Sequence, residues 1–412
     1  MNIKIKIAIV CLSLMAICVK TSAQEFRAQT SEPMELVATV FRLAHNGGWV
    51  NDNAQKYTEQ LDSTFGQYAQ SPAVLYAKKM ARERSLNCDA VASYAVYLEI
   101  HGGHIRINPQ YDASNITVTD DRWTDVYIKN FTRLLDKFYR KTQFHKFFVT
   151  HKRMYDMAAA RFTEQSAKMF NAKCFNEFFG NYGLQDYTVC INMLAYGNYS
   201  ATVNLKDGSN KVFSIHGPSA TCDDGTPSFN LSDGVVIHEY GHAFCNPCMK
   251  ACWPQIADIA ESSYKFVTSE LQAQAYHTAS SMMYETLVRA WECMYIKLNA
   301  GNDDDGTDLL CKLHRERLSF PLVEDVFNGL CKYQARRDLY PDLMSYMPRM
   351  AERINKLKPD SVINSFMERC PEMSVEGIAD GDTAVAPGKK EIKLCFSIPH
   401  KYGCGINGGR YD

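Results

Sequence analysis

The first half of the chain carries apolar residues at intervals of three and four, the spacing that places them on one buried face of an α-helix. Serine followed by proline marks two helix starts, at Ser31-Glu32-Pro33 and at Ser71-Pro72. The pattern predicts helices over residues 31–44, 71–84, 89–98, 123–140 and 144–164. These stretches contain no cofactor-binding loop, so their apolar faces indicate an ordinary hydrophobic core.

The pattern changes to short runs of β-branched and aromatic residues between residues 187 and 215. Three such runs, over residues 187–194, 200–205 and 211–215, are separated by Asn198 and by an Asp207-Gly208 turn, and they predict a small antiparallel sheet. Helical spacing then returns. It predicts helices at about residues 232–245, 256–266 and 278–298, with more helices to about residue 366. Ser232 or Asp233 is the candidate N-cap of the first of them.

The last segment, residues 370–412, is rich in turn residues and contains an alternating stretch at residues 391–396. It predicts a small β appendage that is too short for a complete sandwich domain. Together these patterns predict an α+β fold that is predominantly helical. Residues 24–369 are expected to form one unit with two lobes, in which the small sheet comes just before the helix at 232–245.

The N-terminus has the features of an export signal. Lys4 and Lys6 give it a basic start, residues 7–19 are apolar, and Thr21-Ser22-Ala23 supplies the small residues of a cleavage site. We therefore expect a leader over residues 1–23, cleavage near Ala23, and a mature protein that is periplasmic, on the cell surface or extracellular. No later stretch is long and apolar enough to predict a transmembrane segment in the mature chain.

Charge and cysteine content narrow the possible partners and sites. The 412 residues include 45 Lys and Arg against 46 Asp and Glu, which argues against a nucleic-acid partner because that would need a concentrated basic surface. Loss of the leader would remove Cys11 and Cys18 from the 15 cysteines and leave an odd number. Cys245, Cys248 and Cys252 predict a disulfide or buried thiols rather than a second metal site, since no fourth ligand follows at a fitting spacing.

The most specific chemical signal is His238-Glu239-Tyr240-Gly241-His242, which lies in the helix predicted at 232–245. Residues four apart share one face of a helix, so His238 and His242 can direct both imidazoles at one point. Imidazole suits Zn²⁺, and two histidines with one carboxylate leave a fourth position for water. Glu239 follows the first ligand, where its carboxylate can take a proton from that water. The motif predicts a zinc site with Glu239 as general base.

The third ligand is expected to be an acid from a later helix, because no further histidine follows His242 at the spacing of a three-histidine site. Glu261 and Glu285 are the two candidates, and Glu292 is a weaker rival. The spacing from His242 to Glu261 is familiar from thermolysin-like sites. Glu285 lies in a long apolar helix, where a lone carboxylate is costly unless it is paired. Arg289, one turn later, is expected to orient that carboxylate or simply to form an ion pair with it.

The stretches His-Glu-Tyr-Gly-His-Ala-Phe-Cys-Asn-Pro and Tyr-Glu-Thr-Leu-Val-Arg-Ala resemble an exported bacterial zincin-like family of unknown function, related to the gluzincin zinc metallopeptidases. The resemblance covers residues 35–366. It implies zinc on His238, His242 and Glu285, with Glu239 as base, and a helix that ends at Asn246-Pro247. The tail also resembles, in part, an immunoglobulin-like domain of some members.

The expected function is a secreted zinc metallopeptidase that hydrolyses peptide or protein substrates. A second group usually helps to hold the oxyanion, and Tyr340, just before Pro341, is the candidate. His277 and His314 are lesser candidates for the same role. Two alternatives stay open: an inactive zincin scaffold that acts as a surface binding or adhesion protein, and a zinc hydrolase that is not a peptidase.

Overall fold

The computed structural model describes residues 28–166, 170–180, 184–223, 225–229, 234–299, 304–369, 373–376 and 393–396. The chain forms two compact units. Unit 1 comprises Met1–Phe170 and Gly183–Val236, and unit 2 comprises Asn171–Tyr182 and Ile237–Asp412. The predicted leader, the candidate caps Ser232 and Asp233 and most of the tail lie outside the described residues.

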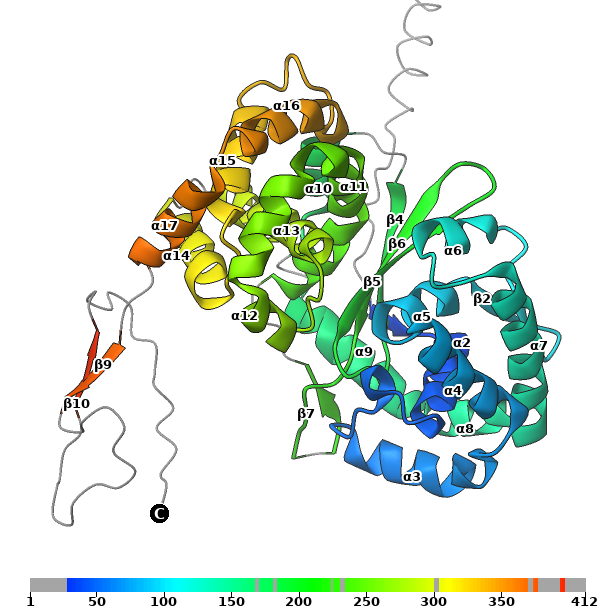
Figure 1. Ribbon diagram of the computed structural model, residues 1–412. Coiled ribbons are helices and arrows are strands. Elements are labelled where there is room, and N and C mark those ends of the chain that lie inside the picture. The colour runs from blue at the N-terminus through cyan, green and yellow to red at the C-terminus, as the bar shows by residue number, and fades with distance from the viewer. Residues whose placement is uncertain are drawn as a thin grey trace, which may run out of the picture. The chain divides into compact units, whose positions relative to one another are not determined.

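Unit 1 contains a four-stranded sheet of order β1-β4-β6-β5, drawn partly as the green arrows in Figure 1. Its strands are β1 (Ala28–Thr30), β4 (Leu184–Ile191), β5 (Asn198–Asn204) and β6 (Asn210–His216). The prediction of an antiparallel sheet is wrong in part, because β1 and β6 both run parallel to β4 and only β5 and β6 are antiparallel. The hairpin after β5 was predictable from its turn, where Gly208 has a φ of 87°. The pairing of distant β1 with β4 had no local signal.

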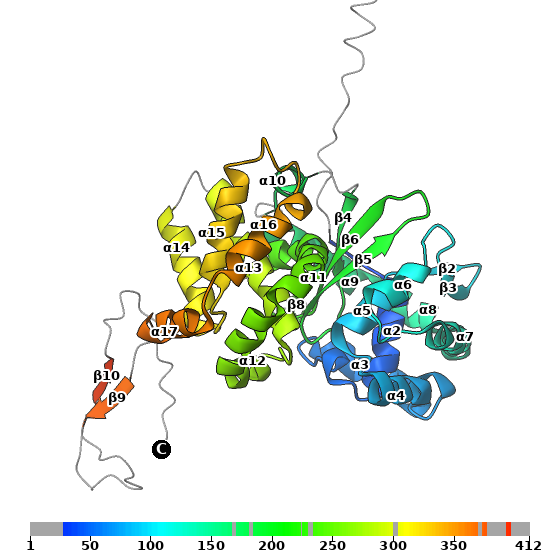
Figure 2. The same cartoon turned by 45° about the horizontal axis from the view of Figure 1, so that its top comes forward.

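Helices surround this sheet in unit 1 (Figures 1 and 2). They are α2 (Glu32–Leu43), α3 (Gln55–Phe65), α4 (Pro72–Arg84), α5 (Cys88–Ala95), α6 (Ser114–Thr119), α7 (Asp125–Thr142), α8 (Phe144–Thr150) and α9 (Lys152–Ser166), with short 3-10 turns at Gly47–Trp49 and Gly66–Tyr68. Ser31 caps α2 by accepting a hydrogen bond from the Met34 N–H, as its serine-proline start predicts. Within unit 1, α5 contacts β5 and α9 contacts β1.

Two of the predicted helices in unit 1 are shorter or divided. The helix expected at 89–98 ends at Ala95, and a hairpin of β2 (Leu98–His101) and β3 (His104–Ile107) follows it. The helix expected at 144–164 is interrupted at His151, between α8 and α9. Two small strands, β7 (Ala220–Thr221) and β8 (Pro227–Ser228), complete the unit as an antiparallel pair.

Unit 2 is mainly helical. Its helices are α10 (Ala172–Phe179), α11 (Val235–Phe266, whose first two residues belong to unit 1), α12 (Thr268–Ala273), α13 (Ala279–Asn299), α14 (Asp304–Lys312), the π-helical turn η3 (Leu313–Arg317), α15 (Val323–Gln334), α16 (Leu343–Asn355) and α17 (Pro359–Arg369). The described part of the tail is an antiparallel pair, β9 (Met373–Glu376) and β10 (Lys393–Phe396), which includes the strand predicted at 391–396.

The predicted end of the motif helix at Asn246-Pro247 is wrong, because α11 continues through Pro247 and Pro254 to Phe266. A proline inside a helix removes one backbone hydrogen bond and bends the helix, but buried apolar contacts can outweigh that loss. Met249, Cys252 and Ile256 are buried on this part of α11. Among the described residues, α11 and the other helices do not combine the length and hydropathy that a bilayer span requires.

Candidate metal centre

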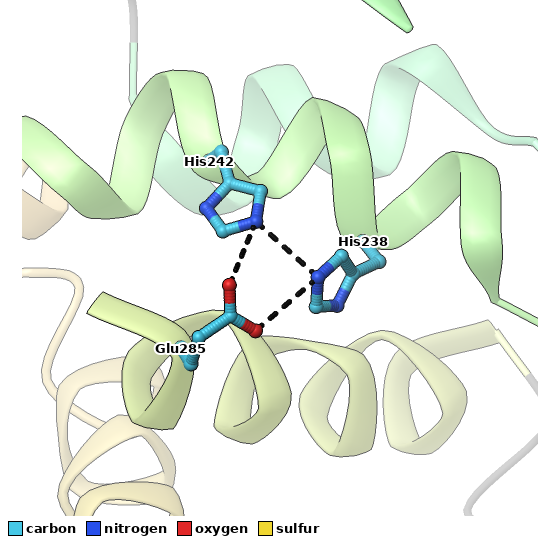
Figure 3. A group of neighbouring side chains, drawn as sticks. All are labelled: His238, His242 and Glu285. Carbon is cyan, nitrogen blue, oxygen red and sulfur yellow. Dashed lines mark hydrogen bonds and ion pairs between the residues drawn. The ribbon is translucent and has the colours of Figure 1, made fainter. Parts of the chain in front are cut away.

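Helix α11 places both motif histidines on one face, as Figure 3 shows. The Nε2 atoms of His238 and His242 face each other at 3.2 Å, and both side chains are largely buried, with 14% and 15% exposed. When both rings are neutral and donate through Nδ1, neither Nε2 atom carries a proton. The two rings therefore present two lone pairs to one small volume.

Helix α13 supplies the third member of the cluster, Glu285. Gly241 allows α13 to lie close to α11, because a Cβ at this position would come within 2.9 Å of Trp291 Cδ1 and 3.4 Å of Val288 Cγ1. Trp291 is fully buried, so it cannot easily move away. The glycine between the motif histidines is thus explained by helix packing as well as by the motif.

The Glu285 carboxylate faces both imidazole rings (Figure 3). His238 Nε2 lies 3.4 Å from its Oε2 and His242 Nε2 lies 3.3 Å from its Oε1, so each ring faces a different oxygen of the same carboxylate. Tetrahedral coordination with bonds of about 2.1 Å requires ligand atoms about 3.4 Å apart. Glu285 Oε2 is buried and has no hydrogen-bond partner. These three side chains therefore fit a divalent metal ion. Among the described residues, they are the group whose ligand atoms lie close enough together to hold one.

Both histidines are oriented by a hydrogen bond on the far side of the ring. His238 Nδ1 lies 3.0 Å from Glu292 Oε1, and His242 Nδ1 lies 3.1 Å from Asn246 Oδ1. Carboxylate and amide oxygens accept hydrogen bonds, so each Nδ1 is the donor, and in the neutral form of each ring Nε2 is the atom with a lone pair for a ligand. Glu292 is thus a partner of a ligand rather than a ligand, which sequence spacing alone did not reveal.

The charges around the cluster decide the protonation of its acids. Burial disfavours an ionised Glu285, but His238, His242 and Arg289 outweigh this effect and lower its pKa. Burial acts on Glu292 in the same way, and His238 and His314 hold its pKa far below the ordinary range. Both carboxyl groups are therefore held as carboxylates in a site that excludes most water.

Glu239 has a different environment. Burial raises its pKa to about 7, although the nearby His238 opposes this shift, and only 7% of the residue is exposed. A carboxyl group that titrates near neutral pH can both accept and return a proton under physiological conditions. This is the property that a general acid–base residue needs.

Comparison with known proteins gives a family but no activity. A family model described as "Domain of unknown function (DUF4932)" matches residues 28–352. The chain belongs to the DUF4932 family. No curated protein and no solved structure matches it. The matched range includes the whole cluster of His238, His242 and Glu285, and the resemblance to zincin-like and gluzincin families stays a prediction.

The structure of this DUF4932 chain shows where the other candidate site residues from the sequence lie. Glu261 is exposed on α11, and none of the cluster's described contacts involves it. Tyr340 lies before α16, packs edge-on against Tyr346 at 5.0 Å and interacts with Arg349, so its described contacts do not reach the cluster. His277 is exposed. The structure therefore brings Glu285, and neither Glu261 nor Tyr340, to the two histidines.

Tyr276 is the tyrosine that the structure brings to the cluster of this DUF4932 chain. Its hydroxyl accepts a hydrogen bond from Arg289 Nη2 at 3.3 Å and also interacts with Glu285. Arg289 in turn lies 3.4 Å from Glu285 Oε2. Tyr276 precedes α13, outside the periodic pattern, so only its place just upstream of the Glu285 helix could have suggested it.

The cysteines after the motif are part of the core. Cys245 and Cys252 are buried free thiols, and Cys248 is buried between them along α11. Burial raises the pKa of Cys252 to about 11, which keeps the thiol protonated and unreactive. The sequence predicted either a disulfide or buried thiols here, and the structure shows buried thiols at Cys245 and Cys252.

Proposed function

We propose that this chain is an exported zinc-dependent peptidase, with zinc held by His238, His242 and Glu285. The observation that carries the proposal is the convergence of two imidazole Nε2 atoms, 3.2 Å apart, on the Glu285 carboxylate, whose oxygens lie 3.3 and 3.4 Å from them, beside a buried glutamate that titrates near neutral pH. Two histidines and one carboxylate are a common ligand set of hydrolytic zinc sites, in which the fourth position stays open.

The residues of the chain have separate roles in this proposal. A zinc ion held by His238, His242 and Glu285 would acidify a water molecule and polarise a substrate carbonyl group. Glu239 would be the group that accepts a proton from the attacking water and returns it to the leaving amine. Arg289 holds the Glu285 carboxylate, and Glu292 and Asn246 hold the two imidazole rings in the orientation that a ligand needs.

Tyr276 replaces Tyr340 as the candidate that stabilises the oxyanion. Its hydroxyl lies beside Arg289 and Glu285, whereas the contacts of Tyr340 are with α16. A tyrosine hydroxyl next to a buried guanidinium is a good hydrogen-bond donor to an oxygen that gains negative charge. Export is proposed from the basic and apolar pattern of residues 1–23.

The test compares the full mature chain with its Glu239→Gln variant on a mixed peptide library, after bound zinc has been measured. Because glutamine cannot accept the proton, we expect turnover to fall by about a hundredfold or more while zinc content stays near one per chain. Glu261→Gln is the matched control, since it makes the same change at an exposed position of the same helix. It should leave both zinc content and turnover unchanged.

Each alternative predicts a different result. A binding protein would take up zinc without turnover in any of the three proteins. Hydrolysis of esters or other substrates without peptide cleavage would indicate a hydrolase that is not a peptidase. A wild-type chain without stoichiometric zinc would overturn the metal site and the peptidase assignment together.

A further inference from the structure

The segment after α14 departs twice from ordinary helix geometry. The turn η3 is π-helical, and the Leu318 N–H donates to the Leu313 carbonyl at 3.2 Å, across five residues. Ser319 then has a φ of 62°, the left-handed region that a residue other than glycine rarely adopts, although it is buried. Single π-helical turns and strained residues concentrate at functional sites, where other contacts hold them in place. The contacts of this segment show which groups it holds in place.

The π-helical turn directs His314 toward the far side of the metal cluster. Only 4% of His314 is exposed, and its Nε2 lies 2.9 Å from Glu292 Oε2. Its Nδ1 lies 3.5 Å from Arg289 Nη1. Arginine can only donate, so Nδ1 accepts from Arg289, and Nε2 faces the Glu292 carboxylate as an ion-pair contact. One imidazole ring thus bridges the anion that orients His238 and the cation that orients Glu285.

The residue after Ser319 contacts the same arginine. Phe320 is fully buried, and its ring lies 4.6 Å from the Arg289 guanidinium and 5.6 Å from the Tyr276 ring. The Phe320 N–H donates to the His314 carbonyl at 3.2 Å. The left-handed turn at Ser319 therefore lets Phe320 pack against Arg289 while His314 contacts Glu292.

The turn is itself tied to its neighbours. Arg315 is buried, and its guanidinium donates to Glu324 Oε2 at 2.9 Å and to Ser365 Oγ at 3.0 Å. Glu324 belongs to α15 and Ser365 to α17. Hydrogen bonds from a buried guanidinium to two helices fix the position of the turn, and with it the position of His314.

We propose that His314 is a positioning residue of the metal centre. It holds Glu292 against His238 and Arg289 against Glu285, so that ligands from two helices keep their geometry before a metal ion binds. The proposal rests on the proposed zinc site and adds a residue that contacts Glu292 and Arg289, the two groups that orient its ligands. Loss of partners that orient metal ligands typically weakens metal binding by about ten- to a hundredfold.

The test measures zinc affinity by competition with a chromophoric chelator on the full mature chain after metal removal. His314→Leu keeps much of the side-chain volume but removes the contacts to both Arg289 and Glu292, and we expect about tenfold weaker zinc binding. His314→Gln keeps a donor and an acceptor at a similar reach and should restore most of the affinity. His277→Leu, the same change at an exposed histidine of unit 2, should bind zinc as the wild type does.

Two further measurements separate positioning from a general effect on folding. The melting temperature of each metal-free variant reports folding, and the visible spectrum of the Co²⁺-loaded chain reports ligand geometry. If His314→Leu does not fold, the pair His314→Gln and His314→Asn decides, because asparagine is too short to reach Glu292 and should bind zinc more weakly than glutamine.

The results that overturn the proposal are distinct from those that overturn the function. A folded His314→Leu variant with wild-type zinc affinity, or equal affinities for the glutamine and asparagine variants, would show that His314 only packs. A wild-type chain that binds no zinc would overturn the proposed function, and the positioning role would fall with it.

Discussion

Buried glutamates occur in both units, and the pKa of Glu35 in unit 1 is shifted in the opposite direction to those of Glu285 and Glu292 in unit 2. In unit 1, Glu35 is fully buried; its Oε1 accepts a hydrogen bond from the Met193 N–H at 2.8 Å and its Oε2 accepts one from the Tyr57 hydroxyl at 2.7 Å. Burial raises its pKa to about 7 despite these two donors. In unit 2, burial is equally unfavourable to Glu285 and Glu292, yet both pKa values are lowered.

The difference lies in the charge of the partners. Neutral donors satisfy the oxygens of Glu35 without replacing the solvation of a full negative charge, so the group keeps a proton up to neutral pH. His238, His242, His314 and Arg289 surround the unit 2 acids with cationic or ionisable groups. A metal ligand must be ionised to bind, so the second environment favours a metal site and the first favours a structural role.

Buried histidines follow the same rule. His216 in unit 1 contacts Ser214 and Asn198, both neutral, and burial lowers its pKa to about 3. Burial also disfavours a charged His238, but Glu292 and Glu285 outweigh it and raise the pKa to about 9 in the metal-free chain. Both comparisons show that partner charge, more than burial, distinguishes the candidate centre from the core of unit 1.

The largest expected effect is the loss of a ligand from unit 2. Glu285→Ala should weaken zinc binding by about a thousandfold, or about 4 kcal/mol, because it removes one of three protein ligands. Glu261→Ala is the matched control and should leave the affinity unchanged, since this residue is exposed. Chelator competition measures both values. The reverse order of the two variants would mean that the cluster in Figure 3 is not the metal site.

A smaller effect is expected on the unfolding free energy, which should depend on pH through Glu35 in unit 1. The folded-state pKa of Glu35 is raised to about 7 from 4.5, so the folded chain binds this proton more tightly than the unfolded chain. The proton on Glu35 therefore stabilises the folded chain fully below pH 4.5. This stabilisation, on the order of 3 kcal/mol, is lost as the pH rises to 7. Urea unfolding of the metal-free chain between pH 4.5 and 8 measures it.

Glu35→Gln removes the titrating group and keeps its shape, so it is the variant that isolates this effect. We expect the fall in unfolding free energy between pH 4.5 and 7 to be smaller by that amount in Glu35→Gln than in the wild type. The same pH dependence in both proteins would contradict the assignment of the proton to Glu35.

The smallest expected effect concerns a single hydroxyl. Tyr57→Phe removes a donor to Glu35, and the unfolding free energy should fall by about 1 kcal/mol, more at pH 8 than at pH 5 because the ionised carboxylate needs the donor most. Tyr127 donates to Glu83 in the same way at 2.8 Å, but this pair is exposed. Tyr127→Phe should therefore change stability little. Equal losses for the two variants would show that burial of the Glu35 pair adds nothing.

Much of the local structure could be predicted from the sequence of neighbouring residues. The serine-proline start of α2, the apolar stripes of the helices, the turn at Asp207-Gly208 and the common face of His238 and His242 depend on neighbours within a few residues. These features were predictable because helical period, capping and turn geometry are properties of short segments. The continuation of α11 past Pro247 was not predictable, because buried contacts outweigh the local helix-breaking signal there.

The amino-acid sequence by itself determined that two imidazoles and the Glu239 carboxylate share one helix, and that the fold is mostly helical with a small sheet. Only the tertiary structure decided that Glu285 contacts those imidazoles and that Glu292 contacts both His238 and His314. It also decided that Tyr276, rather than Tyr340, lies beside the cluster. The physical reason is the same in each case. Spacing along one helix is set by its own backbone, whereas the approach of α13 to α11 depends on packing such as that of Trp291 against Gly241, which involves residues far apart in the chain.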